Sequence, residues 1–164
     1  MKNALYNALD LSCYIAKEYF NKYNRKISNI KLQKSLYFLF AYWGGFMAQN
    51  KLGDVEETFN YTEYLFGDRI EAWTYGPVIP KVYHDFDDYY NESNILNIQT
   101  MLGANEFVKS FIDDLLSEIF PLSDFKLVDI SHDDNCWKDN YNTKDQRHNK
   151  EISKEAIINE YINK

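Results

Sequence analysis

Apolar residues recur at the spacing of an α-helix near the start of the chain, at Leu5, Leu9, Cys13 and Phe20. Side chains three or four positions apart share one helix face, so the pattern predicts an amphipathic helix over residues 3–23. Cys13 lies on the apolar face of this helix, which favours a small buried side chain over a reactive thiol.

The next apolar run predicts a helix over residues 29–49. Ser28 stands where a helix N-cap is expected, and Ile27 with Leu32 forms the pattern of a hydrophobic staple. The apolar residues cover too wide an arc for a surface helix, so we expect this helix at the centre of the fold. Two consecutive glycines at 44–45 predict that another element approaches it closely.

Residues that favour β-strands dominate the stretch 58–75. Within it, Gly67-Asp68 separates residues 64–66 from residues 70–73, which predicts two short strands joined by a turn. A two-stranded hairpin is only marginally stable in water, so it must pack against helices.

The rest of the chain predicts further helices separated by turns. Tyr75-Gly76-Pro77 predicts the end of the second strand, and the polar stretch 91–99 predicts a loop. Start and stop signals at Pro80, Pro121, Ser123 and Ser153 predict helices over residues 80–89, over 104–120, after Ser123 and after Ser153. Between the last two, Cys136, Trp137 and Tyr141 are the plausible anchors of a polar stretch.

No internal repeat and no second apolar core is evident, so we expect one domain over residues 1–164. The predicted fold class is mainly α with α+β character. It is a compact helical domain of five to seven helices with a short two-stranded β-hairpin.

The net charge of −7 is unevenly distributed along the chain. Residues 1–50 carry seven basic and two acidic residues, whereas residues 51–140 carry six basic and nineteen acidic residues, a net charge of −13. An acidic middle repels phosphates, so no nucleic-acid partner is expected. A solvated surface is the preferred interpretation of the N-terminal basic cluster, which comprises Lys22, Arg25, Lys26, Lys31 and Lys34.

The sequence has no pattern typical of a membrane span or an export signal. The longest apolar stretch, residues 35–48, is shorter than a span, and polar residues interrupt the N-terminal segment. We therefore expect no membrane partner and a cytoplasmic location, in which Cys13 and Cys136 are free thiols.

The histidines and cysteines do not form a convincing catalytic or metal site. His132 and Cys136 are four positions apart, the spacing of two ligands on one helical turn, and His84 is a third candidate. This set lacks a fourth soft ligand, and the acidic neighbours of Cys136 disfavour its thiolate. Motifs of nucleotide-binding loops, serine hydrolases and zinc proteases are absent from the sequence. We expect no catalytic residue, no metal, no cofactor and no enzyme activity.

Three segments combine aromatic, polar and turn residues: KLQKSLYF at 31–38, EAWTYGPVIPKVYHDF at 71–86 and SHDDNCWKD at 131–139. In this order they resemble the Panacea domain family, which includes SocA-like antitoxins and phage-associated proteins of the GepA kind. The chain departs from the family's usual pattern by a conservative exchange at two positions and by Ser35, which stands where leucine is usual and thins a core contact.

The resemblance implies a protein that binds another protein. Aromatic anchors inside a charged rim are typical of such surfaces, and here they are expected around the Gly76-Pro77 corner. The predicted partner-binding residues are Lys31, Gln33, Lys34, Glu71, Trp73, Tyr75, Gly76, Pro77 and His84. The residues expected to maintain the motif's structure are Ser28, Leu32, Leu36, Tyr37, His132 and Trp137.

The leading hypothesis is an antitoxin-like protein that neutralises a cognate toxin by direct contact. Two alternatives stay open: an adaptor that delivers a toxin to a cytosolic protease, and a phage-encoded or mobile-element-encoded inhibitor of a host defence protein. The acidic middle of the chain favours the second alternative for a basic target.

Overall fold

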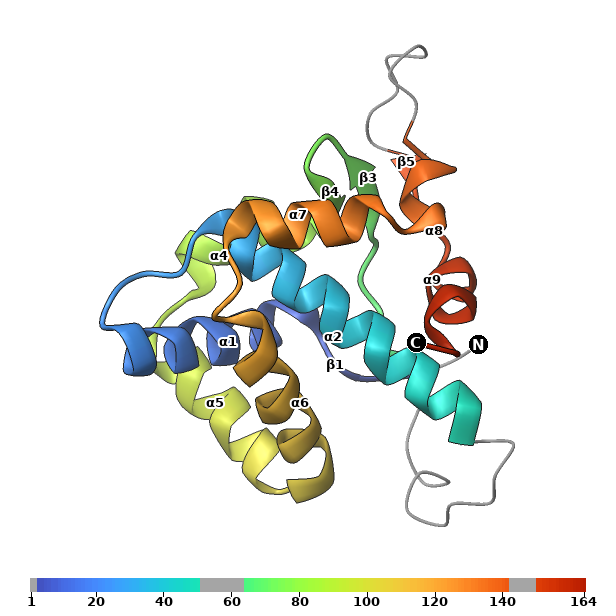
Figure 1. Cartoon of the computed structure of the whole chain (residues 1–164). Coiled ribbons are helices and arrows are strands. Elements are labelled where there is room, and N and C mark those ends of the chain that lie inside the picture. The colour runs from blue at the N-terminus through green and yellow to red at the C-terminus, as the bar shows by residue number, and fades with distance from the viewer. Residues whose placement is uncertain (1–2, 51–63, 142–149) are drawn as a thin grey trace.

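The computed structural model describes residues 3–50, 64–141 and 150–164. In these ranges the helices are α1 (Ala8–Tyr23), α2 (Asn29–Asn50), α4 (Pro80–Tyr89), α5 (Glu92–Gly103), α6 (Glu106–Ile119), α7 (Asp124–His132), α8 (Asn135–Lys138) and α9 (Lys154–Tyr161). The strands are β1 (Ala4–Tyr6), β2 (Tyr64–Phe66), β3 (Glu71–Trp73), β4 (Gly76–Val78) and β5 (Lys150–Glu151). The fold class is therefore mainly α with some β, as predicted (Figure 1). The described helices number eight, more than the five to seven predicted.

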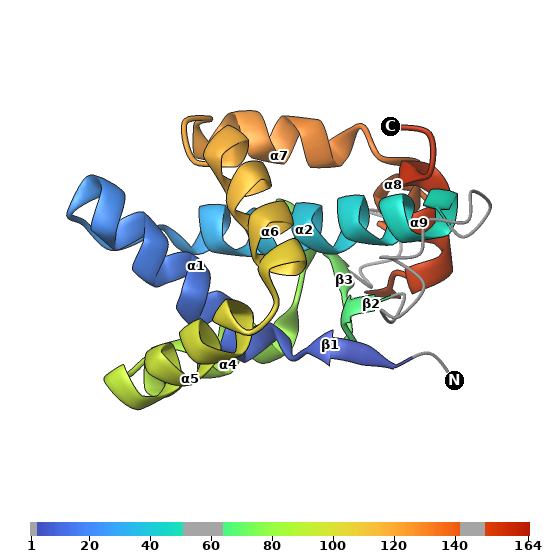
Figure 2. The ribbon, with the colours of Figure 1, turned by 90° about the horizontal axis from the view of Figure 1, so that it is seen from below.

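Helix α2 runs through the middle of the molecule, as its wide apolar arc predicted (Figure 1; Figure 2). It contacts α1, α6, α7 and α9 as well as β2 and β4. A Cβ atom added at Gly45 would lie 2.5 Å from the carbonyl oxygen of Tyr161, so α9 packs directly on the α2 backbone. The close approach predicted from the glycine pair is confirmed.

Helix α1 begins at Ala8, later than predicted, because residues 4–6 form a strand. Its N-cap is Asn7, whose side chain accepts a hydrogen bond from the backbone N–H of Asp10. Helices α4 and α5 pack against α1 (Figure 2).

The prediction of a loop over 91–99 was wrong, because residues 92–99 belong to α5. The Asn91 side chain caps this helix by accepting from the N–H of Asn94, and only two of its residues, Ile98 and Leu102, are buried. A helix that buries only two residues along one narrow line has few apolar positions, so its sequence shows only a weak helical period.

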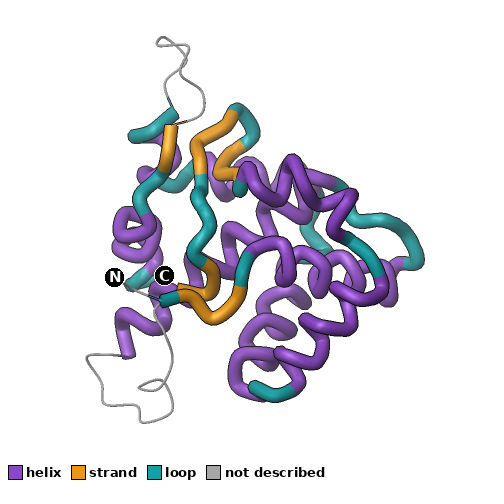
Figure 3. Tube along the Cα trace, turned by 180° about the vertical axis from the view of Figure 1, so that it is seen from behind, coloured by secondary structure: helices purple, strands orange, loops and turns teal. Residues whose placement is uncertain are grey.

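The predicted pairing of strands was also wrong. Strand β2 pairs in parallel with β1, whereas the hairpin consists of β3 and β4 joined through Thr74 and Tyr75 (Figure 3). The Gly67-Asp68 corner does not reverse the chain into a hairpin, because Asp68 accepts a hydrogen bond of 2.9 Å from the N–H of Ala8 at the start of α1. The second predicted strand ends at Trp73, just before Tyr75-Gly76-Pro77, as expected, but Gly76 and Pro77 themselves begin a further strand, β4. Pro77 is tolerated there because β4 is the edge of the β4-β3-β5 sheet.

The later helices begin at the predicted caps. Ser123 accepts from the N–H of Lys126, and Ser153 accepts from the N–H of Ala156. Buried apolar residues from α1 through α9 form one continuous cluster. Of the described helices, none is both long and apolar enough to traverse a lipid bilayer.

Candidate partner-binding site

The three motif segments found in the sequence meet at the β3–β4 hairpin. The first half of α2 and the end of α7 both contact β4, and α8 follows α7 directly. We call the hairpin residues 71–78, together with His132, Trp137 and Tyr141, the hairpin platform.

Helix α2 fixes the base of the platform through two polar side chains. Gln33 donates to the carbonyl of Ile79 at 3.2 Å and accepts from its N–H at 2.8 Å, so one amide binds both backbone groups of that residue. Lys34 donates to the carbonyl oxygen of Pro77 at 3.0 Å. These bonds occupy backbone groups of the strand end that the sheet leaves unpaired.

The position of Gly76 requires glycine. Its φ of +107° lies in a region that residues with a side chain rarely adopt. A Cβ atom there would also lie 2.4 Å from the Ser131 hydroxyl and 2.9 Å from Cε of Lys34. The hairpin therefore closes onto α2 and α7 only because this residue lacks a side chain.

Three stacked rings hold the tip of the hairpin. The rings of His132 and Trp137 stack at 4.1 Å, and those of Trp137 and Tyr141 stack at 4.7 Å. Trp137 donates its indole N–H to the carbonyl of Trp73 at 2.9 Å, and Nε2 of His132 lies 3.0 Å from the carbonyl oxygen of Thr74. The turn is thus bonded to α7 and α8 from one side.

The outer side of the platform presents aromatic rings to solvent. Tyr75 at the turn is 56% exposed, Tyr83 on α4 is 54% exposed, and Trp73 lies edge-on to Tyr83 at 4.9 Å. These rings border a cavity of about 260 Å³ whose floor includes residues from the first turns of α2. Exposed rings on a rigid support are typical of surfaces that bind proteins.

Lys34 lies beneath this cavity with 1% of its surface exposed. Burial lowers the pKa of Lys34 from 10.5 to about 7, because the charged ammonium loses its hydration. Within the described residues, the Lys34 ammonium makes one hydrogen bond, to the carbonyl oxygen of Pro77.

A second polar group, Asp134, joins the C-terminal helices to α2. Its side chain is fully buried and accepts from the hydroxyls of Tyr37 and Tyr161 at 2.5 Å each, and from Nζ of Lys164 at 2.8 Å. Glu160 accepts from the N–H groups of the two residues that follow Asp134. This network fixes α8 beneath the ring stack.

The expectation that Lys31, Gln33 and Lys34 face a partner was wrong in its premise, because all three side chains are buried. Lys31 donates to the carbonyl of Phe120 at 2.8 Å, and its distance to Asp124 is 3.9 Å. All three long polar side chains donate to backbone carbonyls of neighbouring elements. A helical wheel of α2 does not contain these acceptors, so it could not predict that the side chains are buried. With Lys31 and Lys34 buried, the predicted basic cluster does not form one surface.

The remaining predicted residues lie in or next to the platform. Trp73 donates to Glu71, which also pairs with Arg69 at 2.7 Å. His84 is exposed on α4, and its ring lies edge-on to Tyr83. Their role in binding stays a prediction.

The residues expected to maintain the structure of the motif lie in the core, at a helix cap or behind the hairpin. Ser28 caps α2 by accepting from the N–H of Lys31 at 3.0 Å, and Leu32, Leu36 and Tyr37 are buried in the core. The half-buried rings of His132 and Trp137 support the hairpin, as described above.

Sequence reasoning missed the exposure of Tyr83, whereas Tyr141 was among the anchors expected in the polar stretch before the last helix. Tyr83 lies on α4 between Val82 and Phe86, but only those two are buried, and the apolar character of its ring did not indicate that it faces solvent. Tyr141 follows Trp137 by four positions, which places the two rings on one side of a helical turn. This spacing is the signal in the sequence for the stacking of the two rings.

Both cysteine thiols are buried. Burial raises the pKa of Cys13 and of Cys136 to about 12, so both are fully protonated near neutral pH. Across the described ranges, no group of three or more His, Cys, Asp or Glu side chains is arranged to hold a metal ion.

A comparison with protein families identifies the chain. The model of the Panacea domain of SocA-like antitoxins matches residues 53–138, just over half of the chain. The protein belongs to this family, whose antitoxin members imply a protein partner in general. The match contains the hairpin, His132 and Trp137, whereas the α2 motif at 31–38 lies outside it. Neither the curated proteins nor the solved structures gave a match.

Proposed function

We propose that this protein neutralises a toxic partner protein by binding it directly, in the manner of an antitoxin. Membership of the SocA-like family supports this role. The observation that carries it here is the exposed pair of Tyr75, on a hairpin that His132 and Trp137 bond from behind, and Tyr83, on the neighbouring α4.

A rigid aromatic surface has a physical advantage in binding. Ordering a loop on association costs free energy, and a hairpin already held by two helices avoids much of that cost. Tyrosine rings supply a large contact area with few rotatable bonds, and their hydroxyls remain hydrogen-bonded at the rim. Tyr75 and Tyr83 are therefore the proposed anchors.

The proposal takes the protein to act by contact and not by catalysis. The two cysteines have thiols whose pKa burial raises to about 12, which argues against a role for either as a nucleophile. Burial of Lys34 beneath the platform suits a structural bond to Pro77 better than contact with a substrate.

Coexpression with the product of the adjacent gene tests the proposal. The wild-type protein should relieve growth inhibition and elute with the partner in gel filtration, and the partner's half-life should stay unchanged. The double variant Tyr75→Ala/Tyr83→Ala should lose both effects while keeping its unfolding midpoint.

Phe125→Ala is the matched control, because Phe125 is an exposed aromatic residue on α7, 68% exposed and outside the platform. A wild-type protein that neither relieves toxicity nor forms a complex contradicts the proposal. A fall in the partner's half-life would instead favour the protease adaptor.

A further inference from the structure

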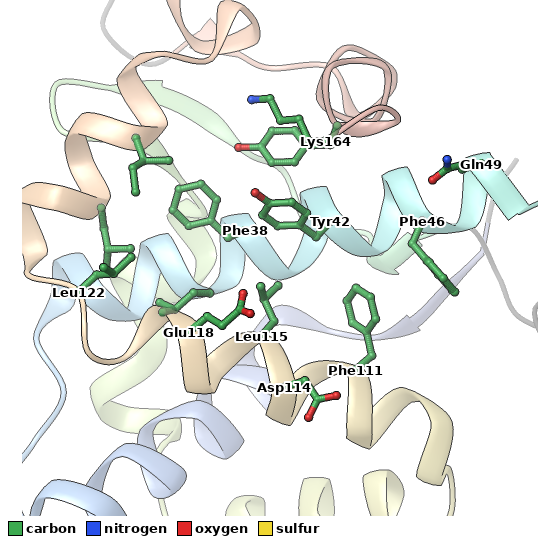
Figure 4. Close-up of a pocket in the computed structure, with 14 residues that line it drawn as sticks. Phe38, Tyr42, Phe46, Gln49, Phe111, Asp114, Leu115, Glu118, Leu122 and Lys164 are labelled. Carbon is green, nitrogen blue, oxygen red and sulfur yellow. The ribbon is translucent and has the colours of Figure 1, made fainter.

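A second surface, separate from the hairpin platform, lies along the other half of α2. Phe38, Tyr42, Phe46 and Gln49 line a groove of about 460 Å³ together with residues of α6 and α7. Phe111 and Leu115 of α6 stand opposite the aromatic side chains of α2 (Figure 4). The platform cavity is lined instead by Asn29, Ile30, Gln33 and Lys34, which lie on a different face of the same helix.

The floor of the groove has the length and periodicity of a helix seat. Phe38, Tyr42 and Phe46 are spaced by four residues, so they form one ridge along α2. From Phe38 to Gln49 the floor extends over about 17 Å at a rise of 1.5 Å per residue, which corresponds to about three helical turns. A helix laid beside α2 would place apolar residues at i, i+4 and i+7 against this ridge.

The α6 edge of the groove is negatively charged. Asp114 and Glu118 are exposed, line the groove and form no salt bridge with any residue in the described part of the chain. Lys164 is the cation among the described lining residues, and its ammonium already binds Asp134 at 2.8 Å. The groove therefore offers two carboxylates without a counter-charge beside an apolar floor.

We infer that this groove binds an amphipathic α-helix of a partner protein, with an apolar face against Tyr42 and Leu115 and basic residues along the flank that meets Asp114 and Glu118. The inference rests on the proposed role as a partner-binding protein and names a second contact surface for it. Apolar burial supplies the affinity, and the two carboxylates fix the direction and the charge of the helix that fits.

Two synthetic helical peptides of about 18 residues test the groove directly, since they span the floor with a margin of one turn at each end. Both carry leucine at i, i+4, i+7 and i+11, and they differ only in having lysine or glutamate along one flank. Fluorescence anisotropy with the full-length protein should show binding of the lysine peptide. The glutamate peptide should bind about tenfold more weakly, because two rim ion pairs become like-charge contacts.

Charge reversal in the protein provides the decisive comparison. Asp114→Lys/Glu118→Lys changes two exposed side chains, so it should fold normally and exchange the preference between the two peptides. Leu115→Glu should abolish binding of both peptides. Tyr75→Ala on the hairpin is the matched control and should leave both affinities unchanged.

Failure of either peptide to bind the wild-type protein overturns the inference, as does a preference that survives the charge reversal. A concentration-dependent dimer that Leu115→Glu converts to a monomer would assign the groove to a second copy of the chain and overturn it as well.

The same variants separate this inference from the proposed function. If the charge-reversal variant still relieves toxicity and binds the partner as the wild type does, the groove is not used and the antitoxin role stands. If the wild type binds the lysine peptide but relieves no toxicity, the groove stands and the antitoxin role fails.

Discussion

The imidazole of His132 stacks on the indole of Trp137 with 4.1 Å between the ring centroids and 18° between the ring planes. The two residues come from α7 and α8, and each reaches a backbone carbonyl near the tip of the β3–β4 hairpin. A three-residue strand pair has little stability of its own. The shape of the exposed platform therefore depends on helices that begin more than 45 residues later in the chain.

Removal of the indole should loosen the hairpin. Trp137→Phe keeps a ring for the stack but loses the N–H that binds Trp73, so the free energy of unfolding should fall by about 1 kcal/mol. Trp137→Ala loses the stack as well and should cost about 3 kcal/mol. Urea unfolding measures both values, and hydrogen exchange should be faster at the hairpin amides. Unchanged exchange in Trp137→Ala would contradict the role of the stack.

Substitution of Asp134 should destabilise the protein more than loss of any one of its donors. Asp134→Ala leaves the buried hydroxyls of Tyr37 and Tyr161 without their acceptor, at a cost of about 3 kcal/mol. Tyr37→Phe should cost about 1 kcal/mol. Lys164→Ala should cost about 0.5 kcal/mol, because that side chain is 41% exposed. Thermal and urea unfolding give the order, and an equal cost for Lys164→Ala and Asp134→Ala would refute it.

The stability of the protein should depend on pH through Lys34. Its pKa is about 7 in the folded state and 10.5 as the ordinary value, so the unfolded chain binds more protons between these two values. The free energy of unfolding is therefore highest above pH 10.5 as far as Lys34 is concerned, declines as the pH falls, and is lowest below pH 7.

The variant Lys34→Met removes that dependence. The stability of the wild type relative to Lys34→Met should therefore rise between pH 7 and pH 9, by up to about 1.4 kcal/mol per pH unit. The lost hydrogen bond to Pro77 adds an offset that does not vary with pH. Urea unfolding at several pH values checks the slope, and parallel curves for the two proteins would rule it out.

The hydroxyl of Ser35 is buried and has no hydrogen-bond partner within the described residues. Ser35→Ala should raise the free energy of unfolding by about 1 kcal/mol, because it removes an unsatisfied polar group from the interior of α2. Ser12 provides the matched control. It is equally buried in α1 but donates to the carbonyl of Leu9 at 2.6 Å, so Ser12→Ala should be destabilising. Equal effects of the two substitutions would disprove the assignment.

The local signals in the sequence were reliable where a residue acts on its own neighbours. Ser28, Ser123 and Ser153 cap the helices that they were expected to cap, because each side chain binds an N–H three residues later. The buried ridge of α2 was likewise readable from its apolar arc. The hydrophobic pattern failed to predict α5, because its two buried residues give almost no helical period.

The candidate site was predicted less well than the fold. The sequence identified the residues that meet at the hairpin, and these do lie close together. It could not show that Lys31, Gln33 and Lys34 point into the protein, since their acceptors are backbone carbonyls of Phe120, Ile79 and Pro77. The groove beside α6 left no signal of its own, because its walls come from four separate helices, α2, α6, α7 and α9.

The sequence by itself determined the helical class, the central position of α2 and the composition of the three motif segments, because periodicity and capping act over a few residues. Only the tertiary structure decided which strands pair, which lysines are buried and where the apolar grooves open. Those properties depend on contacts between residues far apart in the chain, such as Asp68 with Ala8 and Trp137 with Trp73, and local patterns carry no information about them.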